Sequence, residues 1–210
     1  VATGVVALLR EWFAVLGKDE PSPAMVRATM IVGAQNLVTS RDGAGNCFNV
    51  AGGQWTCGDM RPAPDQYQGW GGVSLDRYFR AASKYFFYDQ EVVLCQECTG
   101  AGSTPWTTTV TIDDPTKPVR IALAWTDAAG STALAPEHNL RNDLDLEVST
   151  TGSDGIPHVW YGNLFYLNRD DLARREWSLR DPASVTRDRK NNHEKIAIAK
   201  AGETNGLPAG

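Results

Sequence analysis

The sequence predicts an α+β fold in which helices come first and an antiparallel β-sandwich or jelly roll follows. Up to about residue 88 the apolar residues recur mainly at helical spacing. From about residue 89 the apolar period changes to two, and short segments of this kind alternate with turns rich in Gly, Pro, Asn and Asp. We therefore divide the chain into residues 1–88 and residues 89–210.

Three helices are expected in the first part. "VATGVVALLREWFAVLG" carries an apolar stripe from Val5 to Leu16, although no strong capping residue precedes it. In "PSPAMVRATMIVGAQNL", Ser22 can cap the helix and Pro23 stands at its first position, where a missing N–H costs nothing. A shorter helix is expected in "SLDRYFRAAS", with Ser74 as its cap and with these residues turned inward: Leu75, Tyr78 and Phe79.

Strands are expected wherever apolar residues alternate with polar ones in the second part. Such alternation places Val119, Ile121 and Leu123 on one face of a single strand. The expected strands are "TTTVTI" (107–112), "PVRIALAWT" (118–126), "NDLDLEV" (142–148), "HVWYG" (158–162) and "EKIAIA" (194–199).

Composition excludes two classes of partner. The chain has 210 residues, a net charge of −5 and 42% hydrophobic residues, which is the balance of one large globular domain or two small ones. Lysines and arginines are scattered, so we expect no nucleic-acid surface. No apolar run approaches the roughly 20 residues of a membrane helix, so we expect no membrane-spanning segment.

The four cysteines form two close pairs, Cys47 with Cys57 and Cys95 with Cys98. The spacing is not that of a familiar zinc site, and no histidine flanks it. The C-x-x-C runs into Gly and Ser, whereas a thioredoxin-type pair would open a helix. We interpret the cysteines as two local disulfides, or as free thiols, in an exported protein.

No catalytic constellation is recognisable in these residues. A hydrolase triad needs a nucleophile, a base and an orienting acid, and the three histidines (His138, His158 and His193) all lie in the second part. The chain contains no G-x-S-x-G, no Gly-rich phosphate loop at a strand–helix junction and no histidine pair at helical spacing. We expect each histidine to be a surface residue.

Acidic and amide side chains are the next signal. Alternation sends Asp143 and Asp145 to the same face of a strand, about 7 Å apart, where both could approach one cation. Calcium prefers six to eight oxygen ligands, and clustered acids without nearby bases repel one another unless a cation neutralises them. The alternative is a solvated sheet face with Asn and Asp in its turns. The candidate calcium ligands are Asp127, Asp143, Asp145, Asp188, Asn192 and Glu194.

Several stretches together resemble a known family. "VATGVVALLREW", "PSPAMVRATMIVGA" and "QGWGGVSLDRYF" resemble the last part of the catalytic domain of subtilisin-like serine proteases. "IALAWTDAAG", "NLRNDLDLEV", "YGN" and "NNHEKIAI" resemble, in order, the β-jelly-roll domain that follows the catalytic domain in one branch of that family. The resemblance covers nearly the whole chain.

The resemblance implies the C-terminal part of a secreted serine endopeptidase whose Asp/His/Ser triad lies before Val1. No catalytic residue is then expected in these 210 residues, which should be inactive alone. The resemblance implies a structural role, a protein or peptide substrate that binds through the upstream catalytic portion, and a calcium-binding β domain that continues past "ETNGLPAG". The alternative is a non-catalytic, secreted β-sandwich module that binds protein or glycan.

Overall fold

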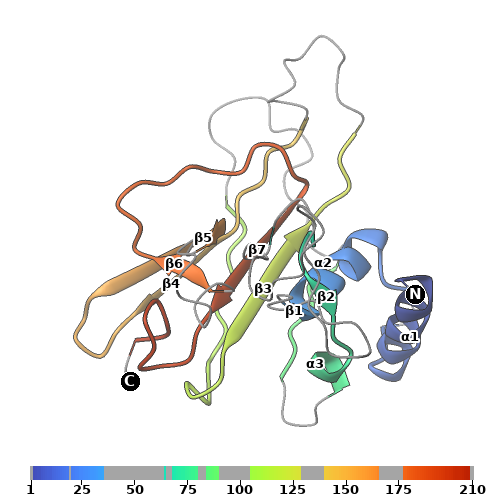
Figure 1. The fold of residues 1–210 in the computed structure, drawn as a ribbon, viewed down its shortest axis with the longest axis horizontal. Helices are drawn as coiled ribbons and strands as arrows, with labels where there is room; N and C mark the ends of the chain where they lie inside the picture. The colour runs from blue at the N-terminus through green and yellow to red at the C-terminus, as the bar shows by residue number, and fades with distance from the viewer. Residues whose placement is uncertain are drawn as a thin grey trace, which may run out of the picture.

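The computed structural model describes residues 2–18, 20–35, 64, 68–79, 84–89, 105–128, 140–165 and 177–208. The helices lie at one side of the molecule, β4, β5 and β6 lie at the other, and β3 and β7 run between them (Figure 1). This arrangement confirms mixed helix and antiparallel-strand content. The elements are α1 Ala2–Val15, α2 Pro23–Gly33, β1 Ala34–Gln35, β2 Gly72–Val73, α3 Asp76–Phe79, β3 Val119–Ala124, β4 Glu147–Thr151, β5 Pro157–Phe165, β6 Ser178–Arg180 and β7 His193–Ile198.

Helix α2 begins as its sequence predicts. The Ser22 hydroxyl oxygen accepts a hydrogen bond from the Met25 N–H at 3.0 Å, and Pro23 is the first helical residue. The Asp89 carboxylate in turn accepts hydrogen bonds from the Ser22 N–H at 2.8 Å and the Ser22 hydroxyl at 2.6 Å. The cap is therefore bound to the segment that follows the helical part of the chain.

Helix α1 packs through aromatic contacts more than through its full apolar stripe. Leu9 and Phe13 are fully buried, but Leu8 and Leu16 are nearly half exposed, so only part of the predicted stripe faces inward. The Trp12 ring lies at the centre of an aromatic cluster, within about 6 Å of each neighbouring ring centroid. Its partners are Phe13, Tyr78, Phe79, Tyr85 and Phe87.

Helix α3 is a single turn that buries one tyrosine under α2. The Tyr78 hydroxyl donates a hydrogen bond to the Thr29 carbonyl at 2.7 Å, and burial raises the pKa of Tyr78 well above its usual range. A Cβ on Gly33 would lie 1.8 Å from the Tyr78 hydroxyl oxygen, so glycine is required there. Phe79 is 49% exposed, so the prediction that it turns inward is wrong; so short a helix buries only one of two adjacent side chains.

The described strands form three antiparallel sheets: β1 with β2, β3 with β7, and β4 with β5 and β6. The strands predicted at 118–126, 158–162 and 194–199 are confirmed as β3, β5 and β7. The strand predicted at 142–148 begins only at Glu147, and β6 has no counterpart among the predictions. Residues 107–112 are not in a strand, contrary to prediction. The arrangement of these sheets as a jelly roll stays a prediction.

The β region has its own apolar core. Trp160, Ile196 and Ile198 are buried at its centre, and partly buried side chains pack around them. The Trp160 indole N–H donates to the Asn205 carbonyl at 3.1 Å, which satisfies the one polar atom of this core residue. The surrounding side chains are Val119, Leu146, Val148 and Leu207.

The helical part and the β region pack directly against each other. Helix α2 contacts β3, and the Lys195 ammonium of β7 donates to the Ala34 carbonyl at 3.3 Å. The Trp70 ring lies 5.5 Å from the ring of His193 and 6.0 Å from that of Phe165. Among the described residues, no helix is both long and apolar enough to cross a membrane.

Candidate functional site

A bulge in β5 brings an amide side chain against β7. Asn163 has a left-handed backbone (φ 57°), at the point where the pairing of β5 with β6 shifts register. Its side-chain oxygen accepts from the Lys195 N–H at 2.9 Å, and its side-chain N–H groups donate to the His193 carbonyl at 3.1 Å and to Asp188 at 2.6 Å. The amide thus pairs with β7 as a neighbouring strand would.

Glu194 lies beside this bulge and is 1% exposed. Its carboxylate accepts a hydrogen bond from the Leu146 N–H at 2.5 Å, and the Gly162 N–H donates to the Leu146 carbonyl at 2.8 Å. A Cβ on Gly162 would lie 2.1 Å from a carboxylate oxygen of Glu194, so only glycine fits beneath this side chain. Residues from three segments therefore enclose one carboxyl group.

This enclosure changes the acidity of Glu194. Burial raises its pKa to about 7, and the negative charges of Asp145 and Asp188 act in the same direction. The Leu146 hydrogen bond and the Arg187 guanidinium oppose the rise. Two of the other predicted ligands, Asp145 and Asp188, thus lie close enough to act on Glu194.

Asp188 has its carboxylate oxygens engaged by neighbouring donors. It accepts from the Lys190 N–H at 2.9 Å, from the Asn191 N–H at 3.2 Å and side chain at 2.7 Å, and from the Asn163 side chain at 2.6 Å. Burial alone would raise its pKa, but these hydrogen bonds to the charged form outweigh it and lower the pKa. Asp188 is therefore an ionised carboxylate that fixes the turn before β7.

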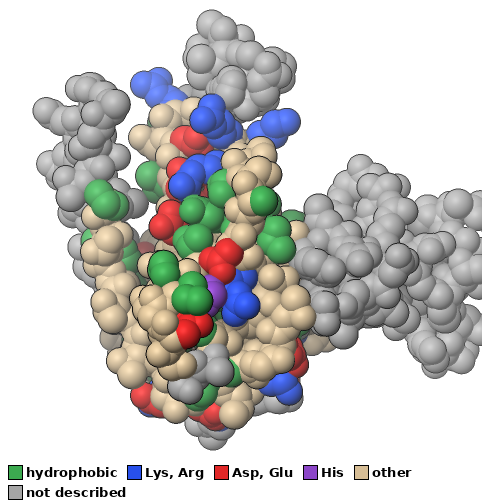
Figure 2. Space-filling view, turned by 90° about the vertical axis from the view of Figure 1, so that its left-hand side faces the viewer, with side chains coloured by type: hydrophobic (Ala, Val, Ile, Leu, Met, Phe, Trp, Pro, Cys, Tyr) green, Lys and Arg blue, Asp and Glu red, His purple; other side chains and the backbone are tan. Residues whose placement is uncertain are grey.

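Asp143 and Asp145 face arginines, which corrects the reasoning that led to a cation at this place. The Arg187 guanidinium lies 3.3 Å from Asp145 and 3.7 Å from Glu147, and that of Arg189 lies 3.8 Å from Asp143. On the face that carries β4, β5 and β6, acidic and basic side chains are interspersed (Figure 2). Asp143 and Asp145 are both exposed and lie before β4 begins, and they have basic neighbours that the sequence spacing did not reveal.

Asp127 and Asn192 lie at the end of β3. Asp127 accepts from the Arg141 N–H at 2.7 Å and from the Asn142 side chain at 2.7 Å. Burial acts against ionisation there, but these bonds prevail and lower the pKa of Asp127. The Asn192 side chain donates to the Trp125 carbonyl at 3.0 Å, so it serves as a donor to the backbone.

The six predicted ligands therefore occupy different surroundings. Within the described ranges, no three His, Cys, Asp or Glu side chains are placed so that they could hold a metal ion together. A calcium ion needs six to eight oxygens, and those of Asp127 and Asp188 already accept several hydrogen bonds. Of the six, Asp145, Asp188 and Glu194 come nearest to a common group. As placed, the donors do not form a calcium sphere.

A histidine–aspartate pair lies at the opposite end of the three-stranded sheet. The His158 ring nitrogen Nδ1 is 2.6 Å from Asp181, whose other oxygen accepts from the Val159 N–H at 2.7 Å. Asp181 has a left-handed backbone (φ 48°), which no sequence pattern predicted. The pair resembles the base and orienting acid of a triad. Within the part of the chain that the structure describes, no nucleophilic side chain hydrogen-bonds to His158.

The other candidates divide between described and undescribed residues. His193 begins β7, and burial, together with the Arg27 charge, lowers its pKa, so its ring is neutral at pH 7. It lies against Trp70 and is not the loop surface residue that the sequence predicted. His138 and all four cysteines (Cys47, Cys57, Cys95 and Cys98) lie outside the described residues.

Comparison with known proteins adds no identification. No protein-family model, no curated protein and no solved structure matches the chain.

Proposed function

We propose that this chain is the C-terminal part of a secreted subtilisin-like serine endopeptidase and that its role is structural. One observation supports this best: segments that resemble the family's helical part contact segments that resemble its jelly roll. Arg27 of "PSPAMVRATMIVGA" donates to the Trp125 carbonyl of "IALAWTDAAG" at 3.5 Å. Trp70 of "QGWGGV" lies against His193 of "NNHEKIAI". The motifs that are similar to one family are thus neighbours in space.

The reaction of the complete enzyme would take place outside this chain. In the proposed enzyme an upstream serine attacks the peptide carbonyl, an upstream histidine takes its proton, and an aspartate orients that histidine, so that an acyl-enzyme forms and is hydrolysed. The role of the present residues is to hold the segment after the serine in place. Contacts such as Ser22 with Asp89 and Lys195 with Ala34 join the two ends of α2 to the second part of the chain.

A serine-directed fluorophosphonate tests the proposal. The full-length precursor should be labelled stoichiometrically, whereas the 210-residue chain should not be labelled, because the nucleophile lies upstream in this proposal. His158→Ala in the precursor is the matched control and should leave labelling unchanged. A folded precursor that fails to label would contradict the enzyme proposal and favour the binding module. Labelling of the chain alone would assign a nucleophile to these residues.

Calcium binding is part of the same proposal, and we place it at the group of Asp145, Asp188 and Glu194. Burial is the main cause of the raised pKa of Glu194, and an ion there would neutralise the charges of Asp145 and Asp188 that add to this rise. The placed donors do not yet form a sphere, so binding would require side-chain rearrangement. If an ion binds only the folded state, calcium at about 100 times its Kd stabilises by about 2.7 kcal/mol.

The measurement is the melting temperature in chelator and in excess calcium, with magnesium as the ionic control. We expect an increase with calcium that Asp188→Asn abolishes. Asp127→Asn should retain the increase, because Asp127 is not among the charges that act on Glu194. Identical melting temperatures in chelator and calcium would exclude the proposed site, and loss of the shift in Asp127→Asn alone would move it to the end of β3.

A further inference from the structure

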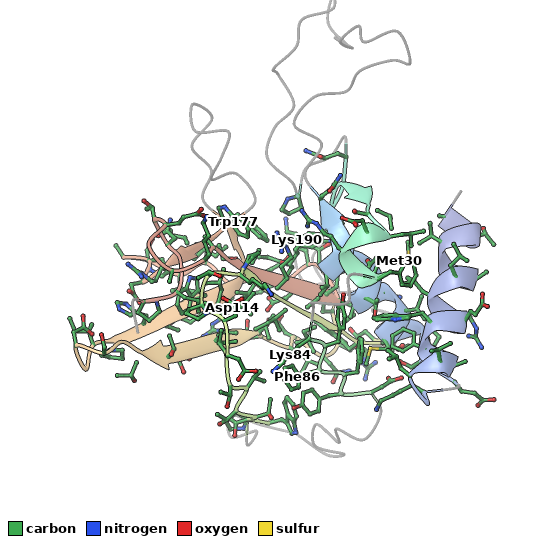
Figure 3. The ribbon with its side chains drawn as sticks, turned by 90° about the horizontal axis from the view of Figure 1, so that it is seen from below. Met30, Lys84, Phe86, Asp114, Trp177 and Lys190 are labelled. Atoms are coloured by element: carbon green, nitrogen blue, oxygen red, sulfur yellow. The ribbon has the colours of Figure 1, made fainter. Side chains whose placement is uncertain are left out.

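The connection between β6 and β7 brings an arginine to the start of β4. This connection comprises residues 181–192 and forms a long loop in Figure 1, and Lys190 marks its position in Figure 3. Asp188 fixes its course by accepting hydrogen bonds from the Asn163 side chain and from the Lys190 N–H. The preceding residue, Arg187, is therefore held at a defined place beside the three-stranded sheet.

The Arg187 guanidinium bridges two acidic side chains. Its nitrogen Nη1 lies 3.3 Å from an oxygen of Asp145, and its Nη2 lies 3.7 Å from an oxygen of Glu147, so each terminal nitrogen faces a different carboxylate. Glu147 pairs across the sheet with Tyr161, and the guanidinium lies 5.1 Å from the centre of the Tyr161 ring. These three contacts hold one planar, permanently charged group at this place.

The same guanidinium acts on Glu194, the buried acid of the group. Burial raises the pKa of Glu194, the charges of Asp145 and Asp188 add to this rise, and the positive charge of Arg187 opposes it. Arg187 therefore supplies these carboxylates with compensating positive charge, which is also what a bound metal ion would supply. Two cations at one place repel each other, so the guanidinium and a metal ion compete for the same acids.

We propose that Arg187 is the resident counter-ion of this acidic group and that a divalent cation binds there only when the guanidinium is displaced. The inference rests on the proposed function, which places calcium at Asp145, Asp188 and Glu194. Calcium takes roughly six to eight oxygen ligands, and the Asp145 oxygen that faces Arg187 is not open to the ion. Arg187 thus neutralises the group without a metal and sets how tightly the ion binds.

Calcium titration of the intact chain tests the inference. The protein is first freed of metal with a chelator, and the dissociation constant is then measured by calorimetry at constant ionic strength. Arg187→Gln removes the competing charge and should bind calcium at least about tenfold more tightly than the unmodified chain does. Arg187→Lys keeps the charge, so its affinity should stay within about threefold of that of the unmodified chain.

Arg189→Gln is the matched control, because it removes the same charge from the same connection. The Arg189 guanidinium lies 3.8 Å from Asp143, which is not among the charges that act on Glu194. The calcium affinity of this variant should therefore change by less than about threefold, since exposed charges outside the group are screened by salt.

The NMR signal of the Arg187 side-chain Nε–H in the unmodified chain gives a second readout that does not depend on whether any variant folds. Calcium should shift this signal as the guanidinium leaves the two carboxylates, and it should leave the corresponding signal of Arg189 in place. An unmoved Arg187 signal at saturating calcium would overturn the inference.

The outcomes separate this inference from the proposed calcium site. Equal affinities of the unmodified chain and Arg187→Gln would overturn the inference and leave the calcium site standing, as would equal gains in the two glutamine variants. Calcium binding by Arg187→Gln alone would support displacement and contradict calcium binding by the natural chain. Binding by neither protein would overturn both.

Discussion

A glycine in the helical part and a glycine in the β region each leave room for a buried polar side chain, but only one of these side chains titrates near neutral pH. Gly33 in α2 leaves room for the buried Tyr78 hydroxyl, and Gly162 in β5 leaves room for the buried Glu194 carboxyl. Tyr78 stays neutral because burial raises the pKa of a group that already titrates far above neutrality. Glu194 has a pKa of about 7, so the same burial makes the second region sensitive to pH near neutrality. The comparison shows that the ordinary pKa of the enclosed group decides whether a buried contact responds to pH.

The largest expected effect is the loss of either glycine. Gly33→Ala and Gly162→Ala should each lower the free energy of unfolding by about 3 kcal/mol or more, because the added Cβ would lie 1.8 Å from Tyr78 and 2.1 Å from Glu194. Gly4→Ala is the control in α1, where nothing lies within 4 Å of the added atom. It should stabilise by about 0.5–1 kcal/mol. Chemical denaturation measures all three, and tolerance of Gly162→Ala would contradict the tight enclosure of Glu194.

The next largest effect is the pH dependence of the free energy of unfolding, which we expect from Glu194 but not from Tyr78. Because the folded pKa of Glu194 is raised from 4.5 to about 7, the folded state binds the proton more tightly than the unfolded state. Stability due to this group should therefore be full below pH 4.5 and should fall as pH rises to about 7, by about 3 kcal/mol in total. Glu194→Gln should remove this slope, measured in chelator, whereas Tyr78→Phe should change stability equally at pH 5 and pH 8.

An unchanged slope in Glu194→Gln would assign the pH dependence to another group. His193 is the first alternative, because burial lowers its pKa and it adjoins Glu194. A group with a lowered histidine pKa destabilises the fold as pH falls, which is opposite to the effect of Glu194. The sign of the measured slope therefore distinguishes the two residues.

A smaller effect is expected at the side chains that pair with β7. Glycine adopts the left-handed backbone of residue 163 without strain, so Asn163→Gly removes only the side chain that pairs with the Lys195 N–H and the His193 carbonyl. Ser178→Ala removes the acceptor of the buried Ala197 N–H at 2.9 Å. Each substitution should cost about 1–3 kcal/mol. Amide exchange should be faster at Lys195 in the first variant and at Ala197 in the second; equal exchange throughout β7 would contradict this pairing.

The smallest effects are expected at the surface arginines. Arg189→Gln should cost less than about 1 kcal/mol, because its pair with Asp143 at 3.8 Å is exposed. Arg187→Gln should cost more, because Arg187 contacts two acids and lies 5.1 Å from the Tyr161 ring centre. It should also raise the pKa of Glu194 further, which a shifted pH profile would detect. No difference between these two variants would contradict the distinct role of Arg187.

Sequence patterns predicted those helices and strands whose formation depends on residues close together in the sequence. The Ser22 cap and Pro23 predicted the start of α2, and alternation predicted β3, β5 and β7. The strand predicted at 107–112 shows the limit of this reasoning, because alternation gives strand propensity but does not supply a partner. The three residues of β6 are too few for periodicity to be seen.

The candidate site was harder to predict because its contacts are long-range. Spacing predicted a common face for Asp143 and Asp145, but it could not show Arg187, which follows three further strands in the sequence. Nothing in "YGN" indicates that Gly162 lies beneath Glu194 or that Asn163 adopts a left-handed backbone. These features depend on how distant segments meet, which a single sequence does not encode in any short motif.

The hydrogen bond from Lys195 to the Ala34 carbonyl spans 161 residues. Contacts of such separation slow folding, because the entropy of closing the intervening chain must be overcome before the contact forms. During synthesis, α2 leaves the ribosome long before β7, the partner strand of β3, has been made. The surfaces of α2 and β3 that contact β7 must then stay unpaired until β7 has been made, which leaves them open to non-native contacts or to a chaperone.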